Sequence, residues 1–174
     1  MTADYVHKEE LRHILAALMP ANRVAMEISL ATGLRIGDVL ALRTEQLGPG
    51  PGPARTTVRE AKTGKARRVT IPADLAARAR RGAGRVYVFP GRLAPDTRHR
   101  TRQAVYKDLR RAAVLYRVRE HVSPHTARKT WAVEALRRHK GDLRRVQQLL
   151  GHEDEAVTLL YAMADVLTAR RLGL

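Results

Sequence analysis

The stretch 123–161 constrains the fold of this chain more than any other part of its sequence, because it contains two helix starts within a short distance. Ser123 is a favourable N-cap residue and Pro124 is favourable at the first helical position, so a helix is predicted to begin there. Gly141 and Asp142 predict the end of that helix and the cap of the next one. The apolar residues of the second helix recur at helical spacing until Gly151: Leu143, Val146 and Leu150. The stretch therefore predicts successive short helices.

Four side chains that can act on a phosphate group are found at the ends of these predicted helices. His125 and Arg128 are three residues apart on the first turn, where side chains at this spacing share one face about 5–6 Å apart. A helix N-terminus also attracts anions, so the pair predicts a phosphate-binding corner. His152 directly follows the second helix, and Tyr161 comes nine residues later, after an apolar run. The spacing predicts that two histidines, an arginine and a tyrosine are presented from successive helix ends.

This arrangement resembles the tyrosine recombinase, or phage integrase, family. The resemblance rests on H-x-x-R at His125 and Arg128, on L-L-G-H ending at His152, on the tyrosine nine residues later, and on ATGLRIGDVLAL around Arg35. The four motifs occur in the order of the family, at similar intervals, and together they extend over 27–161. Ser123 and Pro124 replace the leucine and arginine that usually precede the histidine in the family, but neither is a catalytic position.

The resemblance implies a mainly α fold with a small antiparallel β-sheet (α+β), which is the fold of tyrosine recombinase catalytic domains. It implies a single catalytic domain over 1–174, with the family's N-terminal core-binding domain absent from this chain. It also implies a site-specific recombinase or integrase that cleaves and rejoins DNA through a covalent 3′-phosphotyrosyl intermediate, without ATP, metal or another cofactor. The catalytic residues that the resemblance implies are Arg35, Lys62, His125, Arg128, His152 and Tyr161.

The chemistry of these side chains suits attack on a phosphodiester. The five-coordinate phosphorus formed on the way carries negative charge on its non-bridging oxygens, so fixed cations such as arginines stabilise it. A tyrosine phenol, with a pKa of about 10, is a good leaving group, which suits a covalent intermediate that must later be reversed.

The charge of the chain indicates a polyanionic partner. Lys and Arg number 33 against 17 Asp and Glu, and the resulting net charge of +16 exceeds what solubility requires. A merely solvated basic surface is the alternative interpretation. Together with the resemblance, the charge predicts double-stranded DNA as the partner, bound by a homo-oligomer, a tetramer, on the DNA. The candidate DNA-binding residues are Lys65, Arg67, Arg98, Arg100, Arg102 and Lys107.

Several classes of protein are excluded or disfavoured. The chain has no cysteine, which excludes disulfides and thiolate metal sites. No run approaches the roughly 20 apolar residues of a membrane span, and no apolar signal-peptide core is found near the start. The expected location is the cytoplasm, in association with the nucleoid. His121 and His125 are spaced like a zinc pair, but Pro124 lies between them and no third ligand is evident, so no metal site is predicted.

Two further segments carry predicted site residues. Arg35 is flanked by Leu34 and Ile36, so its guanidinium is expected to be partly buried, with Asp38 as its partner on the protein side. The β-prone segments 56–59 and 68–71 enclose Lys62-Thr63-Gly64-Lys65, which predicts a hairpin with glycine in its turn. The resemblance assigns Lys62 to the active site and Lys65 to a contact with the DNA backbone. Lysines at a hairpin tip can also be simply solvated.

The remaining elements are predicted from periodicity and from turn residues. Apolar periodicity predicts a first amphipathic helix from Val6 to Met19 that stops at Pro20, and a second from about Asn22 to Gly33. The other expected elements are a loop at 48–53, a helix over 73–80, a strand-like run at 86–89, an exposed, mobile loop facing DNA at 91–103, a helix over 101–116 and a last helix over 165–172.

Three alternatives remain open at this point. Tyr161 could be a core residue, with Tyr5, Tyr87, Tyr106 or Tyr116 as competing nucleophiles, and only its interval from His152 favours it. The protein could be a non-catalytic DNA-binding regulator on the same fold. It could also be a strand breaker of the type IB topoisomerase kind, which shares the chemistry without pairing two sites.

Overall fold

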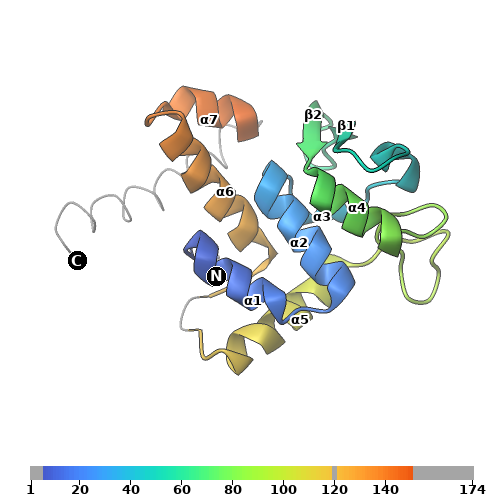
Figure 1. Cartoon of the computed structure of the whole chain (residues 1–174). Helices are drawn as coiled ribbons and strands as arrows, with labels where there is room; N and C mark the ends of the chain where they lie inside the picture. The colour runs from blue at the N-terminus through green and yellow to red at the C-terminus, as the bar shows by residue number, and fades with distance from the viewer. Residues whose placement is uncertain (1–5, 119–120, 151–174) are drawn as a thin grey trace.

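A computed structural model of the chain describes residues 6–118 and 121–150 (Figure 1). Helices form most of this part, together with one two-stranded antiparallel sheet, so the predicted mainly α fold with a small sheet is confirmed. The elements in chain order are α1 (Lys8–Ala16), α2 (Pro20–Thr32), α3 (Ile36–Leu40), the 3-10 helix η1 (Thr44–Leu47), β1 (Ala54–Arg59), β2 (Ala66–Ile71), α4 (Ala73–Gly82), α5 (Arg102–Leu115), α6 (Pro124–Arg138) and α7 (Leu143–Leu150).

Helix α2 forms the centre of the domain (Figure 1). Helices α1, α3, α4 and α6 and strand β2 all pack against it. Ala25, Met26 and Ile28 are fully buried, because neighbours cover α2 on more than one side. A helix with this much buried apolar surface is a core helix, and the elements around it are held in place by contact with it.

Two amphipathic helices, α1 and α5, pack against each other along one edge of this core (Figure 1). The predicted apolar face of α5 is confirmed, since Val105, Leu109 and Ala112 are completely buried. In α1, Leu11 and Leu15 are likewise buried on one face. Each helix therefore keeps one polar face toward solvent, as its periodicity predicts.

The boundary between the first two helices differs from the prediction. Helix α1 ends at Ala16, and Pro20 is the first residue of α2 instead of only a stop before a helix from Asn22. Proline suits this position because the first helical N–H has no partner within the helix and the ring fixes a helical φ angle.

Strands β1 and β2 form the predicted hairpin, and each begins two residues earlier than the β-prone segment in the sequence. The register runs from Ala54 opposite Ile71 to Arg59 opposite Ala66. Gly64 adopts φ 68° in the turn, a left-handed conformation that glycine adopts without strain. The strand-like run predicted at 86–89 does not form a strand: Tyr87 makes an isolated bridge with Arg43.

The caps predicted for the last described helices are confirmed. Ser123 Oγ accepts a hydrogen bond from the backbone N–H of His125 at 3.2 Å at the start of α6. Gly141 is left-handed with φ 86°, and Asp142 Oδ1 accepts from the backbone N–H of Arg145 at 3.0 Å at the start of α7. Leu143, in contrast, is 43% exposed, so the buried face of α7 consists of Val146 and Leu150.

The helix predicted over 73–80 is confirmed as α4, whereas the one predicted over 165–172 lies outside the described residues. The loop at 91–100 folds back on itself, with the backbone N–H of Gly91 donating to the carbonyl of Arg98 at 2.8 Å. No helix within 6–118 and 121–150 has both the length and the apolar character that a membrane span needs.

Candidate active site

Arg35 lies at the junction of α2 and α3, where Gly33 ends α2 in a left-handed conformation. The side chain of Arg35 is 10% exposed, which confirms the predicted partial burial. Its Nη1 donates to Glu60 Oε2 at 2.6 Å, a short, charge-assisted hydrogen bond. The predicted partner, Asp38, is therefore not the residue that accepts this bond, and no local sequence signal pointed to Glu60 as the partner of Arg35.

Arg128 reaches the same junction from α6. Only 3% of Arg128 is exposed. Its Nη1 donates to the carbonyl of Gly33 at 2.7 Å, across 95 residues of sequence, and its Nη2 donates to the carbonyl of Leu150 at 2.8 Å. The structure therefore brings Arg128 next to the segment that carries Arg35.

The ends of two helices explain why the guanidinium groups gather here. Gly33 is the C-cap of α2 and Leu150 is the last residue of α7. Carbonyls in the last turn of a helix have no partner within it and carry partial negative charge, so cations bind there favourably. The C-terminus of α2 thus acts as an acceptor for arginine side chains that arrive from distant segments.

Arg67 is the second arginine at the end of α2. Its Nη2 donates to the carbonyl of Thr32 at 2.7 Å and its Nη1 to that of Gly33 at 3.4 Å. The guanidinium also lies over the ring of Trp131, 5.4 Å from the ring centroid. Burial lowers the pKa of Arg67, although the nearby Glu60 opposes this effect. Arg67 is one of the candidate DNA-binding residues predicted from the sequence, whereas in the structure its side chain points into the protein.

Two carboxylates balance these cations. Glu60 is 1% exposed, and its Oε1 lies 3.9 Å from Arg67 Nη1. Asp38 is also buried, and its Oδ1 accepts from the backbone N–H of Ala61 at 2.9 Å. Buried carboxylates require such partners because the cost of removing their charge from water is otherwise uncompensated.

The pKa of Asp38 is raised above its usual value of 3.8. Burial is the main cause, and the neighbouring charge of Glu60 adds to it. The hydrogen bond from Ala61 lowers the pKa, as do the charges of Arg35 and Arg128. Both arginines are therefore close enough to Asp38 to act on it electrostatically.

The hairpin turn that carries Lys62 is bound to the two carboxylates beside the arginines. Thr63, the residue after Lys62, donates its hydroxyl to Glu60 Oε2 at 3.2 Å, and Ala61 before it is bound by Asp38. Both Lys62 and Lys65 are exposed. The turn is thus fixed at its base, next to the arginines.

The other predicted catalytic residues are split between described and undescribed parts of the chain. His125 is exposed on the first turn of α6, one helical turn before Arg128. His152 and Tyr161 lie outside the described residues. Of the six predicted catalytic residues, the structure therefore describes Arg35, Lys62, His125 and Arg128.

The candidate DNA-binding residues outside the hairpin lie between the end of the 91–100 loop and α5. Arg98, Arg102 and Lys107 are exposed, as a contact to phosphate requires. Arg100 is half-buried, and its Nε is buried without a hydrogen-bond partner in the described structure.

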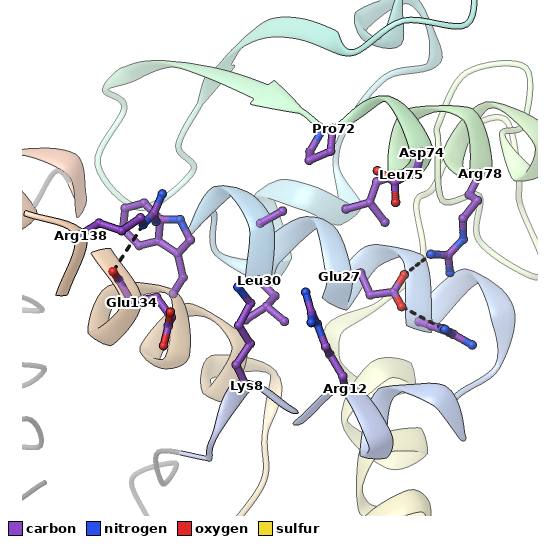
Figure 2. Close-up of a pocket in the computed structure, with 13 residues that line it drawn as sticks. Lys8, Arg12, Glu27, Leu30, Pro72, Asp74, Leu75, Arg78, Glu134 and Arg138 are labelled. Carbon is purple, nitrogen blue, oxygen red and sulfur yellow. Dashed lines mark hydrogen bonds and ion pairs between the residues drawn. The ribbon is translucent and has the colours of Figure 1, made fainter. Parts of the chain in front are cut away.

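A separate cleft of about 550 Å³ opens between α1, α2, α4 and α6 (Figure 2). Glu27 accepts from Arg23 and from Arg78 within it, and Arg138 extends over the rim from α6. Trp131 lines this cleft, and its ring also contacts the guanidinium of Arg67. The cleft therefore adjoins the arginines at the end of α2. None of the described candidate catalytic residues lines the cleft.

Comparison of the sequence with those of known proteins identifies its family and relatives. The sequence model described as "Phage integrase family" matches residues 4–167. The tyrosine recombinase XerC of Xanthomonas campestris pv. campestris (strain B100) is 34% identical over 150 residues, which cover 83% of this chain and 44% of XerC. The tyrosine recombinase XerD of Ralstonia nicotianae is 34% identical over 148 residues, covering 80% of this chain and 47% of XerD. The chain spans about half the length of these curated relatives.

Structural comparisons agree on the fold. The XerH site-specific recombinase bound to a palindromic difH substrate, in a post-cleavage complex, aligns with a TM-score of 0.71 at 19% identity over 89% of this chain and 48% of XerH. A lambda integrase (75-356) dimer bound to a COC' core site aligns with a TM-score of 0.68 at 18% identity over 90% of this chain and 58% of the integrase.

Proposed function

Because this chain belongs to the phage integrase family of tyrosine recombinases, we propose that it catalyses site-specific cleavage and rejoining of duplex DNA through a covalent 3′-phosphotyrosyl intermediate. The observation that carries the proposal is the convergence of Arg35 and Arg128 at the C-terminal turn of α2, next to the hairpin that bears Lys62. A binding protein without chemistry has no physical need for two buried arginines held at the end of one helix, because burying their charge is costly.

The reaction assigns one role to each candidate residue. The phenolic oxygen of Tyr161 forms a bond to the scissile phosphorus, and the bond from phosphorus to the 5′-oxygen breaks. His125 accepts the phenolic proton, and the ammonium group of Lys62 donates a proton to the departing 5′-oxygen. Rejoining is the reverse, in which a 5′-hydroxyl attacks phosphorus and the tyrosine leaves.

The charge that develops on the non-bridging oxygens is balanced by Arg35 and Arg128, and His152 donates a hydrogen bond to one of these oxygens. These cations are held by hydrogen bonds to protein groups before the DNA arrives, so little reorganisation is needed during the reaction. In this scheme protein side chains supply the positive charge and the proton transfers.

The substrate and the assembly follow from the same proposal. Double-stranded DNA fits the net charge of +16. XerH and lambda integrase, which share the fold, have been described in complexes with DNA, the latter as a dimer. We extend this to a homo-oligomer, a tetramer on DNA, that acts on nucleoid DNA in the cytoplasm.

The test is the formation of a covalent adduct. The protein is incubated with a pool of nicked duplexes that are randomised around the nick, so that the cleaved end is lost and the intermediate accumulates. A denaturing gel should show a protein band shifted by the attached strand. Tyr161→Phe should lose this band while binding DNA within a few-fold, because only the nucleophilic oxygen is removed.

Each of the other possible results of this experiment would favour a different function or a different nucleophile. An adduct formed by the Tyr161→Phe variant would mean that another tyrosine is the nucleophile. Binding without any adduct would favour the non-catalytic regulator. Relaxation of a supercoiled plasmid without pairing of two sites would favour topoisomerase-like strand breakage.

A further inference from the structure

We infer that Glu60 is a positioning residue that sets the orientation of the Arg35 guanidinium for the reaction. The inference rests on the proposed function, since it specifies how one of the proposed catalytic arginines is held. Glu60 itself has no direct role toward DNA in this inference, because 1% of it is exposed and its carboxylate faces protein groups.

Three groups surround the carboxylate of Glu60. Its Oε2 accepts from Arg35 Nη1 at 2.6 Å and from the hydroxyl of Thr63 at 3.2 Å. Its Oε1 lies 3.9 Å from Arg67 Nη1 and has no hydrogen-bond partner among the described residues. The strongest directional contact of Glu60 is therefore the bond to Arg35.

The alternation of the hairpin explains why Glu60 reaches this place. Side chains of a strand point to opposite faces in turn, so Val58 and Glu60 lie on one face of β1 and its continuation. Val58 is paired with Arg67 across the sheet, and both side chains are turned toward the protein interior. Glu60 follows this inward row and meets Arg35 at the end of α2.

A bond to a single guanidinium nitrogen restricts the whole group. The guanidinium is planar, so fixing Nη1 in a short, charge-assisted bond limits rotation of the plane and the directions in which the other N–H groups point. The low-dielectric surroundings of a buried carboxylate strengthen this effect. Glu60 is thus suited to keep Arg35 aligned toward a bound phosphate.

The same chain offers a matched control. Glu27 also bridges two arginines, Arg23 and Arg78, but it does so in the cleft of Figure 2, which none of the described candidate catalytic residues lines. Glu27→Gln therefore removes an arginine-bridging carboxylate of similar type without touching the proposed machinery. Any general cost of losing such a bridge is measured by this variant.

The main experiment compares Glu60→Gln with Glu27→Gln and the parent in single-turnover cleavage of a nicked duplex selected from the randomised pool. Glu60→Gln preserves size and removes the charge, and it should slow cleavage by about 10- to 100-fold, as small misplacements of reacting groups do. The Glu27→Gln variant should cleave at a rate within about twofold of the parent rate. A difference of that size is small beside the loss expected for Glu60→Gln.

Two further measurements show whether Glu60 acts through Arg35. In an Arg35→Ala background, Glu60→Gln should add less than about a twofold loss, because the group it positions is gone. A full multiplicative loss would overturn the inference. A 5′-bridging phosphorothiolate, whose sulfur leaves without an acid, should not restore Glu60→Gln, and restoration would show that Glu60 acts through Lys62 instead.

An activity-independent readout separates this inference from the proposed function. In NMR spectra of arginine-labelled protein, the Nη groups of Arg35 should show slow rotation in the parent and in Glu27→Gln, and fast averaging in Glu60→Gln. Unchanged slow rotation in Glu60→Gln would refute the positioning role. A parent protein that never forms an adduct would refute the proposed function, whichever way the NMR result falls.

Discussion

At the scale of single residues, the site is built from arginines that lie inside the protein. Arg128 and Arg67 both donate to the carbonyl of Gly33, and Arg35 is held two residues further along the chain. Surface arginines would lose side-chain entropy on binding a phosphate, whereas these are already ordered by protein acceptors. The cost of burying their charge is offset by carboxylates and by the end of α2.

Replacing either of the two hairpin lysines by alanine should have a different effect: loss of Lys62 should slow cleavage, and loss of Lys65 should weaken DNA binding. Lys62→Ala should cleave normal DNA about 100-fold or more slowly, because the departing 5′-oxygen then lacks its acid. A 5′-bridging phosphorothiolate should restore cleavage close to the parent rate, since sulfur needs no proton to leave. Single-turnover rates on both substrates measure this difference.

Lys65→Ala and Arg128→Ala serve as controls for that prediction. Lys65→Ala should mainly weaken binding, and Arg128→Ala should be slow on both substrates because the transition-state charge stays uncompensated. Rescue of Lys65→Ala by sulfur, or failure to rescue Lys62→Ala, would show that the general acid has been assigned to the wrong residue.

Gly33 should be intolerant of any side chain. Its φ angle is 69°, and an added Cβ would lie 2.5 Å from the ring of Trp131. Gly33→Ala should lower the free energy of unfolding by about 2–4 kcal/mol, from left-handed strain plus overpacking. Urea denaturation of Gly33→Ala and Gly48→Ala provides the test, because Gly48 has φ 62° but no atom within 4 Å of an added Cβ. Equal losses in the two variants would disprove the role of Trp131.

At the scale of elements, Asp108 joins α5 to the start of α2. Its Oδ2 accepts from the backbone N–H of Met19 at 2.8 Å and from Asn22 Nδ2 at 2.7 Å, and its Oδ1 accepts from Arg111 Nη2 at 2.8 Å. Burial raises the pKa of Asp108, but the hydrogen bonds from Asn22, Arg111 and Met19 together lower it below the usual 3.8. The ionised form is therefore stabilised by folding.

This arrangement predicts a pH-dependent contribution to stability. Asp108→Asn should lower the free energy of unfolding by about 1–3 kcal/mol at neutral pH, where the carboxylate is charged. Because the folded pKa is depressed, this contribution is present above the unfolded pKa of about 3.9 and is lost as pH falls toward the folded pKa. Urea denaturation curves at several pH values should show parent and variant converging in that acidic range.

Asp96→Asn is the matched control for the element-scale prediction. Asp96 pairs with Arg85 at 3.2 Å, but its side chain is 46% exposed. Such a surface pair contributes about 0–1 kcal/mol, so this variant should differ little from the parent at any pH. A pH-independent loss in Asp108→Asn would mean that the charge of Asp108 is unimportant to the junction.

At the scale of the whole molecule, the excess of basic residues should control DNA affinity through salt. With six to ten phosphate contacts, affinity should fall by about 10³- to 10⁵-fold between about 50 and 200 mM salt, because counterions are released on binding. Fluorescence anisotropy of a labelled duplex at increasing salt gives this slope. A flat salt dependence would contradict DNA binding by the basic surface.

The same measurement distinguishes exposed from buried basic residues. Lys107→Ala and Lys65→Ala should each reduce the salt slope by about 1, as loss of one phosphate contact does. Arg67→Ala should leave the slope unchanged and lower the stability of the fold instead, because the structure directs Arg67 to Thr32, Gly33 and Trp131. A reduced slope in Arg67→Ala would restore the role first predicted from sequence.

Local signals in the sequence were sufficient to predict most elements of the fold. The cap at Ser123, the break at Gly141 and the hairpin turn around Gly64 all depend on residues within a few positions of one another. The apolar face of α5 is likewise a property of one segment. Such features form from the same contacts wherever the segment lies, so the pattern alone identifies them.

The alternation of side chains along the hairpin is a sequence signal for which of its residues face the core. Glu60 continues the inward row of Val58, and Arg67 stands on the inward face opposite it, so strand geometry alone indicates that both face the core. Their partners are different, because Arg35 and Trp131 come from segments far away in sequence. The alternation along a strand indicates which side chains face the core, but it does not identify the residues that they contact there.

The helices, the hairpin and the family can be predicted from the sequence because they depend on local spacing and on motif order. The folded structure is needed to show that Glu60 binds Arg35, that Arg67 binds the carbonyl of Thr32, and that the end of α2 accepts Arg128. These contacts join segments up to 95 residues apart. Which partner a buried charged side chain meets depends on which distant carbonyls and carboxylates surround it after folding, and no local pattern contains that information.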